Sequence, residues 1–356
     1  MSAATRPPVA GANLDDAAIA RLSAYLDDRL GGLPGPLLAK RFEGGQSNPT
    51  YLLQAGDRRY VMRSKPAPAA QLLPSAHAIE REFRLQSALR DSPVPVARMH
   101  CLCEDESVIG RAFYLMDFVD GRIFWDPSLP GMSTAGRGAL YDELNRVIAA
   151  LHTTDVAALG LSDYGKPGNY FERQMARWTR QYRASETVRI EAMERLIDWL
   201  PGHIPADSGS IVSLVHGDYR LDNVIFHPSE PRILAVIDWE LSTLGHPFAD
   251  FAYHLMTWHL APAPFRGTAG LDLNALGIPD EASYVRTYEA RTGRTVTGDW
   301  NYYLAYNVFR LAAIMQGIVK RAGEGVASSP QAMAYARQVE PLAELGCRFA
   351  DRVGSR

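Results

Sequence analysis

The chain has 356 residues, of which 47% are hydrophobic and 22% charged, and its formal net charge is −3. This length suits two lobes or domains rather than one core, and the ordinary apolar share excludes wholesale disorder. The small net charge and the lack of a long Lys/Arg run argue against nucleic acid or an anionic membrane as a partner.

The cysteines and the apolar segments predict a cytoplasmic protein. Three cysteines are an odd count without a regular framework, which is typical of reduced thiols. Residues 1–12 lack the apolar core of a signal peptide. The most apolar long segment, 302–319, contains Asn307, Arg310 and Gln316, which a membrane-spanning helix would rarely carry.

The first third of the chain predicts a small sheet with one main helix. Residues 1–13 are expected to be flexible, and Asn13 can cap a helix over 14–30. Strand-like runs and one further helical run then follow in the order 37–42, 50–54, 59–63, helix 75–89, 98–103 and 112–118. We therefore expect an N-terminal lobe over 14–118.

After the turn at Asp120-Gly121 the chain becomes mainly helical, and 119–356 form the second predicted lobe. A long loop is expected at 261–279, which is rich in Pro, Gly and Ala. Short β-like runs cover 214–215, 224–226 and 233–237. Helical patterns cover 139–152, 170–182, 189–199, 248–259, 283–291, 299–321 and 329–351.

The strongest chemical signal is a loop that carries Asp218 and Asn223 at the spacing Asp-x-x-x-x-Asn, followed by Asp238 after a β-like run. Phosphoryl transfer needs a carboxylate that takes or orients the hydroxyl proton, and oxygen ligands for Mg²⁺. Asp218 fits the first role, and Asn223 and Asp238 fit the second. The alternative is a set of solvated hairpin turns, since Asp, Asn and Gly favour turns. His216 is predicted to brace the loop, and Asp250 to tie it down.

This pattern resembles the catalytic and metal loops of protein kinases, with His-Gly-Asp in place of His-Arg-Asp. That form is similar to the aminoglycoside phosphotransferase and choline kinase superfamily, from about residue 37 to at least 259. Three motifs most resemble its branch fused to acyl-CoA dehydrogenases: His216–Arg220, Ile237–Glu240 and the run from Gly245 to Asp250. The resemblance implies an α+β, protein-kinase-like bilobal fold with a small antiparallel N-terminal β lobe, a larger mainly helical C-terminal lobe, and ATP between the lobes.

The expected phosphate loop lies between the first two strands. Gly44 and Gly45 let backbone N–H groups approach phosphate, and Ser47 adds a hydroxyl. Taken alone, a segment of this kind is more often a hairpin turn than a nucleotide site. Because it precedes the catalytic loop, in the order that the family has, we favour contact with phosphate.

Register with the family places Arg63 where kinases carry a phosphate-binding lysine. Glu80 and Glu82 on the following helix compete to pair with it, and we prefer Glu82. The alternative for each glutamate is a solvated helix position. Whether Arg63 fully replaces the lysine is not decided by the sequence, because Arg is a fork donor rather than a point charge.

The resemblance further implies an interlobe hinge at Met116, Phe118 and Val119, where the backbone would meet the adenine edge. The alternative, a buried edge strand, is compatible with that role. Arg220, two residues after Asp218, is predicted to reach the γ-phosphate. Its alternative is an ion pair with Asp222 or Glu240.

Four residues are predicted to face the acceptor: Trp239, Glu240, Tyr306 and Arg310. Aromatic walls with one fixed cation suit a hydroxy acid or a hydroxyacyl thioester, and Arg122 could add a second contact. The alternative is a core helix in which Arg310 pairs internally.

We therefore expect a small-molecule kinase that transfers the γ-phosphate of ATP, with Mg²⁺, to a hydroxyl group. A nucleotide-binding pseudokinase scaffold is one alternative, and an aminoglycoside- or choline-type kinase is another. A protein kinase is disfavoured because no activation segment follows Asp238. The acceptor, the choice of ATP or GTP and the oligomeric state, a homodimer included, are not in the sequence.

Overall fold

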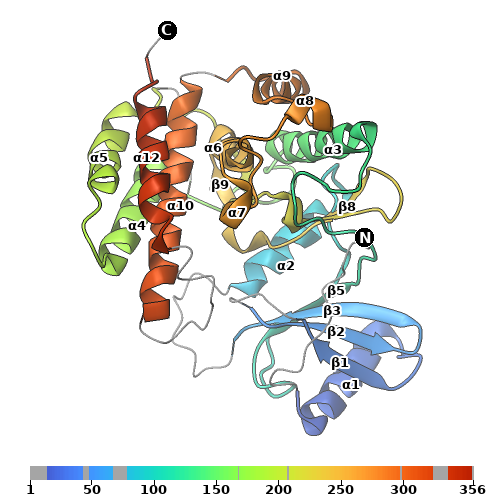
Figure 1. The fold of residues 1–356 in the computed structure, drawn as a ribbon. Coiled ribbons are helices and arrows are strands. Elements are labelled where there is room, and N and C mark those ends of the chain that lie inside the picture. Colours follow the sequence, from blue (N-terminus) through green and yellow to red (C-terminus); the bar gives the residue numbers. More distant parts are fainter. Residues whose placement is uncertain are drawn as a thin grey trace. The chain divides into compact units, whose positions relative to one another are not determined.

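The computed structural model describes residues 14–42, 48–66, 78–166, 168–206, 208–296, 299–323 and 336–354. A five-stranded antiparallel sheet lies in the N-terminal part, and the C-terminal part is mostly helical (Figure 1). The predicted kinase-like α+β fold class is therefore confirmed.

The chain forms two compact units by its internal contacts. Unit 1 consists of Met1–Phe124, Asp155–Tyr164 and Arg220–Ser242, and unit 2 consists of Trp125–Thr154, Gly165–Tyr219 and Thr243–Arg356. Unit 1 thus includes two segments from beyond residue 118, so it does not coincide with the lobe predicted over 14–118. The lobe boundary itself stays a prediction.

The sheet of unit 1 has the strand order β1-β2-β3-β5-β4. Alternate residues of β2, among them Tyr51 and Leu53, are buried against α1, whose Leu22 and Leu26 are also buried. Asp15 caps α1 through the N–H of Ala18, two residues after the predicted cap at Asn13, which lies outside the described residues. The elements are α1 (Asp16–Leu30), β1 (Leu37–Arg41), β2 (Thr50–Ala55), β3 (Arg58–Ser64), β4 (Met99–Cys103) and β5 (Phe113–Asp117).

The other elements of unit 1 carry polar side chains next to this sheet. Helix α2 (Ile79–Ala88) continues into the 3₁₀ turn Leu89–Asp91, and the predicted start of this helix at Ser75 lies outside the described residues. Strands β7 (Val224–Phe226) and β8 (Ile233–Val236) form a hairpin between the 3₁₀ turns η3 (Leu221–Asn223) and η4 (Trp239–Leu241).

The hairpin is joined to the segment after β5 at Gly121. A Cβ on Gly121 would lie 2.3 Å from the carbonyl oxygen of Phe226, so a larger residue cannot stand there without movement of the hairpin. Arg122 and Phe226 exchange two backbone hydrogen bonds of 2.7 and 2.8 Å. The β7–β8 hairpin is therefore fixed to the chain that leaves the sheet.

Unit 2 is built around α10, which packs against α12, α4 and α6. Strands β6 and β9 form a two-stranded antiparallel sheet, and β6 packs against α3 and α6. The elements are α3 (Thr134–Thr153), α4 (Tyr170–Ser185), α5 (Glu191–Trp199), a 3₁₀ turn (Leu200–His203), β6 (Ser213–Val215), β9 (Thr243–Gly245), α6 (Pro247–Leu255), a 3₁₀ turn (Met256–Trp258), α7 (Pro262–Phe265), α8 (Leu273–Leu276), α9 (Glu281–Thr292), α10 (Trp300–Gly323) and α12 (Val339–Ala350).

Three sequence predictions differ from these elements. Helix α3 begins at Thr134 rather than 139, because Ser133 accepts the N–H of Gly136 as an N-cap. The predicted loop 261–279 contains the one-turn helices α7 and α8. Strand β9 was not predicted, since three residues are too few for a periodic pattern. The predicted start of the last helix at Ser329 lies outside the described residues.

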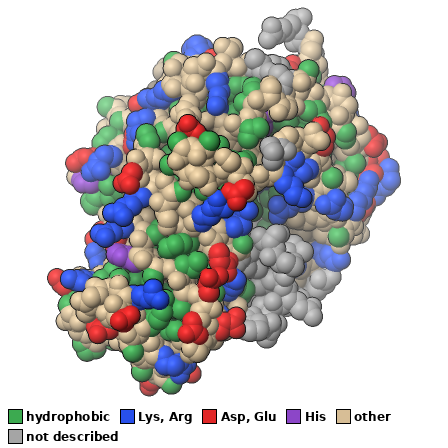
Figure 2. Space-filling view, turned by 180° about the vertical axis from the view of Figure 1, so that it is seen from behind, with side chains coloured by type: hydrophobic (Ala, Val, Ile, Leu, Met, Phe, Trp, Pro, Cys, Tyr) green, Lys and Arg blue, Asp and Glu red, His purple; other side chains and the backbone are tan. Residues whose placement is uncertain are grey.

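Charges of both signs are interspersed over the face seen in Figure 2. No helix among the described residues has the length and apolar character needed to cross a bilayer.

Candidate active site

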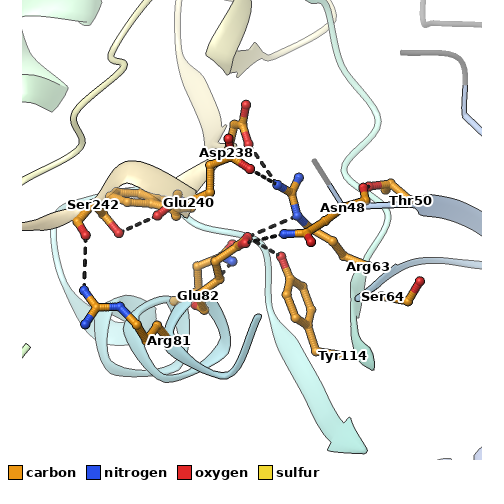
Figure 3. Close-up of polar contacts among 12 residues, drawn as sticks. Asn48, Thr50, Arg63, Ser64, Arg81, Glu82, Tyr114, Asp238, Glu240 and Ser242 are labelled. Atoms are coloured by element: carbon orange, nitrogen blue, oxygen red, sulfur yellow. Dashed lines mark hydrogen bonds and ion pairs between the residues drawn. The ribbon is translucent and has the colours of Figure 1, made fainter. Parts of the chain in front are cut away.

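Arg63 is the centre of a cluster of charges in unit 1 (Figure 3). Its Nε lies 3.2 Å from Glu82 Oε2, and its Nη2 lies 3.0 Å from Asp238 Oδ1 and 3.2 Å from Glu240 Oε2. The forked guanidinium makes this possible, because its nitrogens point in different directions, which a lysine ammonium cannot reproduce. Arg63 thus pairs with Glu82, whereas Glu80 pairs with Lys65.

The Glu82 carboxylate is only 3% exposed and is held on both oxygens. Tyr114 donates its hydroxyl to Oε2 at 3.0 Å, and Asn48 donates its amide to Oε1 at 3.3 Å. Burial by itself would lower the pKa of Arg63, but Glu82, Tyr114 and the two other carboxylates outweigh it and hold this pKa above its ordinary value. Arg63 therefore remains a cation within the cluster.

Sequence reasoning missed Asn48 and Tyr114. Tyr114 stands directly across from Arg63 in the β3–β5 register, so a correct strand pairing would have indicated it. Asn48 carries no comparable signal.

Helix α2, which carries Glu82, is anchored within unit 1. Arg81 Nη2 donates to the carbonyl of Tyr164 at 2.9 Å, and its guanidinium lies 4.4 Å from the centroid of that ring. The Tyr164 hydroxyl is 2.8 Å from Ser242 Oγ, and Ser242 also accepts from Arg81 through its carbonyl (Figure 3). These contacts fix the position of Glu82 relative to the segment that carries Asp238.

Asn223 and Asp238 lie at the same end of the β7–β8 hairpin. Asn223 immediately precedes β7, Asp238 follows β8, and the N–H of Ile237 donates to the Asn223 carbonyl at 2.9 Å. Asp238 has φ +66° and ψ +57°, a left-handed conformation that is uncommon for a residue with a side chain and frequent at functional sites.

One carboxylate and one amide oxygen are the donors that Mg²⁺ accepts when phosphates and water complete its octahedron. Among the described residues, no group of three or more His, Cys, Asp or Glu side chains forms a metal site. The Asn223–Asp238 pair therefore suits a metal that arrives with a polyphosphate rather than a closed protein cage.

In unit 2, Asp218 follows β6 in a loop whose backbone is tightly held. The N–H groups of His216 and Gly217 each donate to the Asp250 carboxylate at 2.8 Å. The N–H of Asp218 donates to His216 Nδ1 at 3.1 Å, and Gly217 has φ +83°. Asp250 thus ties down this loop and His216 braces it, as the sequence predicted.

Asp250 is itself supported by His152, which the sequence did not indicate. His152 Nε2 is 3.1 Å from Asp250 Oδ2, and its Nδ1 is 2.6 Å from the Tyr288 hydroxyl. Burial holds the pKa of His152 below its ordinary value, so a neutral ring donates to Asp250 and accepts from Tyr288. Burial alone would raise the pKa of Asp250, but His152 and the loop amides outweigh it and lower this pKa.

Several residues of unit 1 that were predicted to contact phosphate or the acceptor make contacts within the unit. Arg220 pairs with Asp222 at 2.8 Å, which is the predicted alternative to phosphate contact. Trp239 was predicted to face the acceptor, but it is 1% exposed and donates to the Val236 carbonyl at 2.9 Å. Arg122 likewise donates to backbone carbonyls of the β7–β8 turn.

Two predicted acceptor residues of α10 are buried. Tyr306 is 0% exposed, and Arg310 is 5% exposed and donates to the Gly217 carbonyl. The guanidinium of Arg310 also contacts the rings of Trp178 and Tyr253. This is the internal pairing that the sequence analysis gave as the alternative to acceptor contact.

The predicted hinge belongs to the sheet. Met116 pairs with Val61 of β3, and the N–H of Phe118 donates to the Arg59 carbonyl at 3.3 Å. The Phe118 N–H is therefore engaged within unit 1, and the contact of Met116, Phe118 and Val119 with the adenine edge stays a prediction. The phosphate-loop residues Gly44, Gly45 and Ser47 lie outside the described residues.

Comparison with known proteins decides the family. The model of the "Phosphotransferase enzyme family" matches residues 39–285. The chain belongs to this family. It is a kinase-type transferase whose acceptor is an alcohol group.

The family's curated relatives include longer proteins. The chain is 48% identical over 339 residues to acyl-CoA dehydrogenase family member 10 of Mus musculus, covering 94% of the chain and 31% of that protein. It is 40% identical over 341 residues to acyl-CoA dehydrogenase family member 11 of Homo sapiens, and the match covers 94% of this chain and 43% of that protein. The chain therefore spans less than half the length of these relatives.

Solved structures share the fold. A crystal structure described as a putative aminoglycoside phosphotransferase from Ralstonia eutropha is 59% identical with a TM-score of 0.87, covering 94% of this chain and 98% of that one. A spectinomycin phosphotransferase, solved with ADP and spectinomycin, has a TM-score of 0.61 at 13% identity, and the match covers 93% of this chain and 98% of that one. The second likeness extends to the fold alone.

Proposed function

We propose that this phosphotransferase moves the γ-phosphate of ATP to a hydroxyl of a small acceptor, with Mg²⁺ as the metal. The observation that carries the proposal is the link from Glu82 through Arg63 to Asp238. Protein kinases require a cation paired with a helix glutamate and a metal-binding aspartate, and unit 1 holds all three groups in contact. GTP remains the alternative donor.

Each polar residue then has a defined role. Asn223 and Asp238 would hold the ion, which supplies positive charge to the β- and γ-phosphates. Arg63 binds phosphate oxygens, with Gly44, Gly45 and Ser47 as further donors. Arg220 reaches the γ-phosphate after leaving Asp222.

In the transfer step, the acceptor oxygen forms a bond to the γ-phosphorus while the bond from that phosphorus to the β–γ bridging oxygen breaks. Asp218 takes the hydroxyl proton, and ADP leaves with the bridging oxygen. The support for Asp218 is its place in a loop held by four hydrogen bonds: Asp250 and His216 accept three of them from loop N–H groups, and Arg310 donates the fourth.

For the acceptor we propose a hydroxy acid or a hydroxyacyl thioester. The similarity to acyl-CoA dehydrogenase family members 10 and 11 supports an acyl group.

A side-by-side transfer assay tests the proposal. The purified chain is given ATP labelled on the γ-phosphate, Mg²⁺ and, in separate reactions, hydroxyacyl-CoAs, free hydroxy acids, choline and kanamycin, with Asp218→Asn as the blank. Label should enter the hydroxyacyl compounds. Preference for choline or kanamycin contradicts the acceptor class, and nucleotide binding without transfer to any compound favours a pseudokinase scaffold.

A further inference from the structure

The peptide between Gly217 and Asp218 is held at both of its polar ends. Its N–H donates to His216 Nδ1 at 3.1 Å, and its carbonyl accepts from Arg310 Nη2. On the far side of Asp218, the Tyr219 hydroxyl donates to the carbonyl of Leu144 at 3.0 Å. The peptide that immediately precedes the Asp218 Cα is therefore engaged at its N–H and at its carbonyl.

Arg310 occupies a site built for a guanidinium. Its Cζ lies 4.6 Å from the ring centroid of Tyr253 and 5.3 Å from that of Trp178, distances at which aromatic faces attract a cation. Among the described residues, no carboxylate forms an ion pair with it. Burying a charge without an acidic partner is unfavourable, and an apolar side chain would fill the same space without that cost. The guanidinium therefore suggests a role for its hydrogen bond to the loop.

The charge on Arg310 also faces the loop. Burial by itself would lower the pKa of Arg310, but Tyr253, Tyr306, Tyr170 and Asp218 outweigh it and keep this pKa above its ordinary value. Asp218 is the carboxylate in that set, which places the guanidinium within electrostatic range of the proposed proton acceptor.

We propose that Arg310 is a positioning residue for Asp218: it holds the Gly217 carbonyl and so fixes the direction of the Asp218 carboxylate. Gly217 has φ +83° and no Cβ, so nothing in its own side chain resists rotation of this peptide. Without Arg310, the carbonyl of this peptide loses the hydrogen bond that holds it, while its N–H still donates to His216. The inference rests on the proposed role of Asp218 as the group that takes the acceptor proton.

A positioning role and an acceptor-binding role predict different kinetics. A positioning residue lowers kcat and leaves KM for both substrates nearly unchanged, because it changes how often Asp218 is aligned. A residue that binds the acceptor's anionic group instead raises the acceptor KM. Arg310 is 5% exposed, which agrees with the first role.

The variants Arg310→Met and Arg310→Lys test the inference, with Gln316→Leu as the control. Gln316 lies on the same helix, is 3% exposed, and donates to the Ser185 carbonyl at 2.8 Å rather than to the loop. We measure kcat and both KM values with ATP and the acceptor found in the transfer assay. We also measure hydrogen exchange of the loop peptide that contains Gly217 and Asp218, without nucleotide.

Arg310→Met should lower kcat by about 10²-fold with both KM values within about threefold, since small misalignment of a reacting group has effects of this size. Arg310→Lys should recover part of the loss, and the loop amides should exchange faster in both variants. Gln316→Leu should keep kcat and loop exchange.

Unchanged kcat and loop exchange in Arg310→Met overturn the inference, and so does a rise in acceptor KM alone or an equal loss in Gln316→Leu. If Arg310→Met does not fold, Arg310→Lys decides by the same criteria. If the wild type transfers phosphate to no acceptor, the proposed function fails, and loop exchange alone then decides whether Arg310 holds the peptide.

Discussion

Arg63 and Asp238 are 175 positions apart in the sequence, and Nη2 of the first lies 3.0 Å from Oδ1 of the second. The same guanidinium reaches the buried Glu82 with its Nε at 3.2 Å. Arg63 therefore joins a helix carboxylate to the aspartate that we assign to the metal. Under the proposed metal assignment, Asp238 would share its oxygens between the ion and Arg63.

Arg63→Met should destabilise the protein by about 3 kcal/mol, because it leaves Glu82 buried without its cation. Lys65→Met is the matched control directly after the same strand, since the Lys65–Glu80 pair is about one-third exposed and should contribute less than about 1 kcal/mol. Urea unfolding followed by tryptophan fluorescence measures both. An equal decrease in unfolding free energy in the two variants would show that the buried Arg63–Glu82 pair contributes no more than the exposed Lys65–Glu80 pair.

Asp218→Asn should keep the fold and the affinity for nucleotide but lower kcat by about 10²–10⁴-fold, because an amide cannot accept the hydroxyl proton. Thermal melting and ATP titration provide the controls for folding and binding. Turnover near the wild-type value in a folded variant would remove Asp218 from the proton-accepting role.

Asn223→Ala and Asp238→Ala should each raise the Mg²⁺ concentration needed for half-maximal rate, since each removes an oxygen ligand. Mg²⁺ is titrated at fixed ATP. Glu230→Gln is the control, because this acid lies on the same β7–β8 hairpin and its side chain is 55% exposed. An unchanged Mg²⁺ requirement in both ligand variants would contradict the metal assignment.

His254 should make stability depend on pH. Burial lowers the pKa of His254 to about 4, whereas the unfolded chain binds this proton near pH 6.5. Between these values the unfolded state holds more protons, so stability is complete above about pH 6.5 and falls toward pH 4, by at most about 3 kcal/mol.

His254→Gln should flatten the plot of unfolding free energy against pH between 4 and 6.5. Tyr284→Phe removes the hydroxyl that lies 2.9 Å from His254 Nε2 and should keep the slope, because burial is the larger cause. A slope that is unchanged in His254→Gln would assign the pH dependence to other groups.

The order of the chemical motifs, and the succession of a small sheet and a mainly helical part, could be predicted because both depend on local pattern. The kinase-like fold class was implied by the resemblance to the family. Strands and helices followed hydrophobic periodicity, and the spacing from Asp218 to Asn223 is a property of one short loop. Register with the family placed Arg63 at the phosphate-binding position. Each of these could be stated without knowledge of tertiary contacts.

The rest depended on contacts between distant segments. His152 supports Asp250 from the last turn of α3, where a buried histidine has no distinguishing neighbours in sequence. Arg310 was expected to face the acceptor because it is the cation of an aromatic helix face, and only packing shows that this face lies in the core of unit 2. The three residues of β9 form a strand because they pair with β6, a contact between segments far apart in the sequence.

The discontinuity of unit 1 has a consequence for synthesis of the protein on the ribosome. Arg63 is made 175 residues before Asp238, and at about 5–20 residues per second this corresponds to roughly 10–35 s of translation. During that interval Arg63 of β3 and Glu82 of α2 have already been synthesised, while the β7–β8 hairpin does not yet exist. The N-terminal segment must therefore remain unfinished, and exposed to chaperones, until Ser242 has been added.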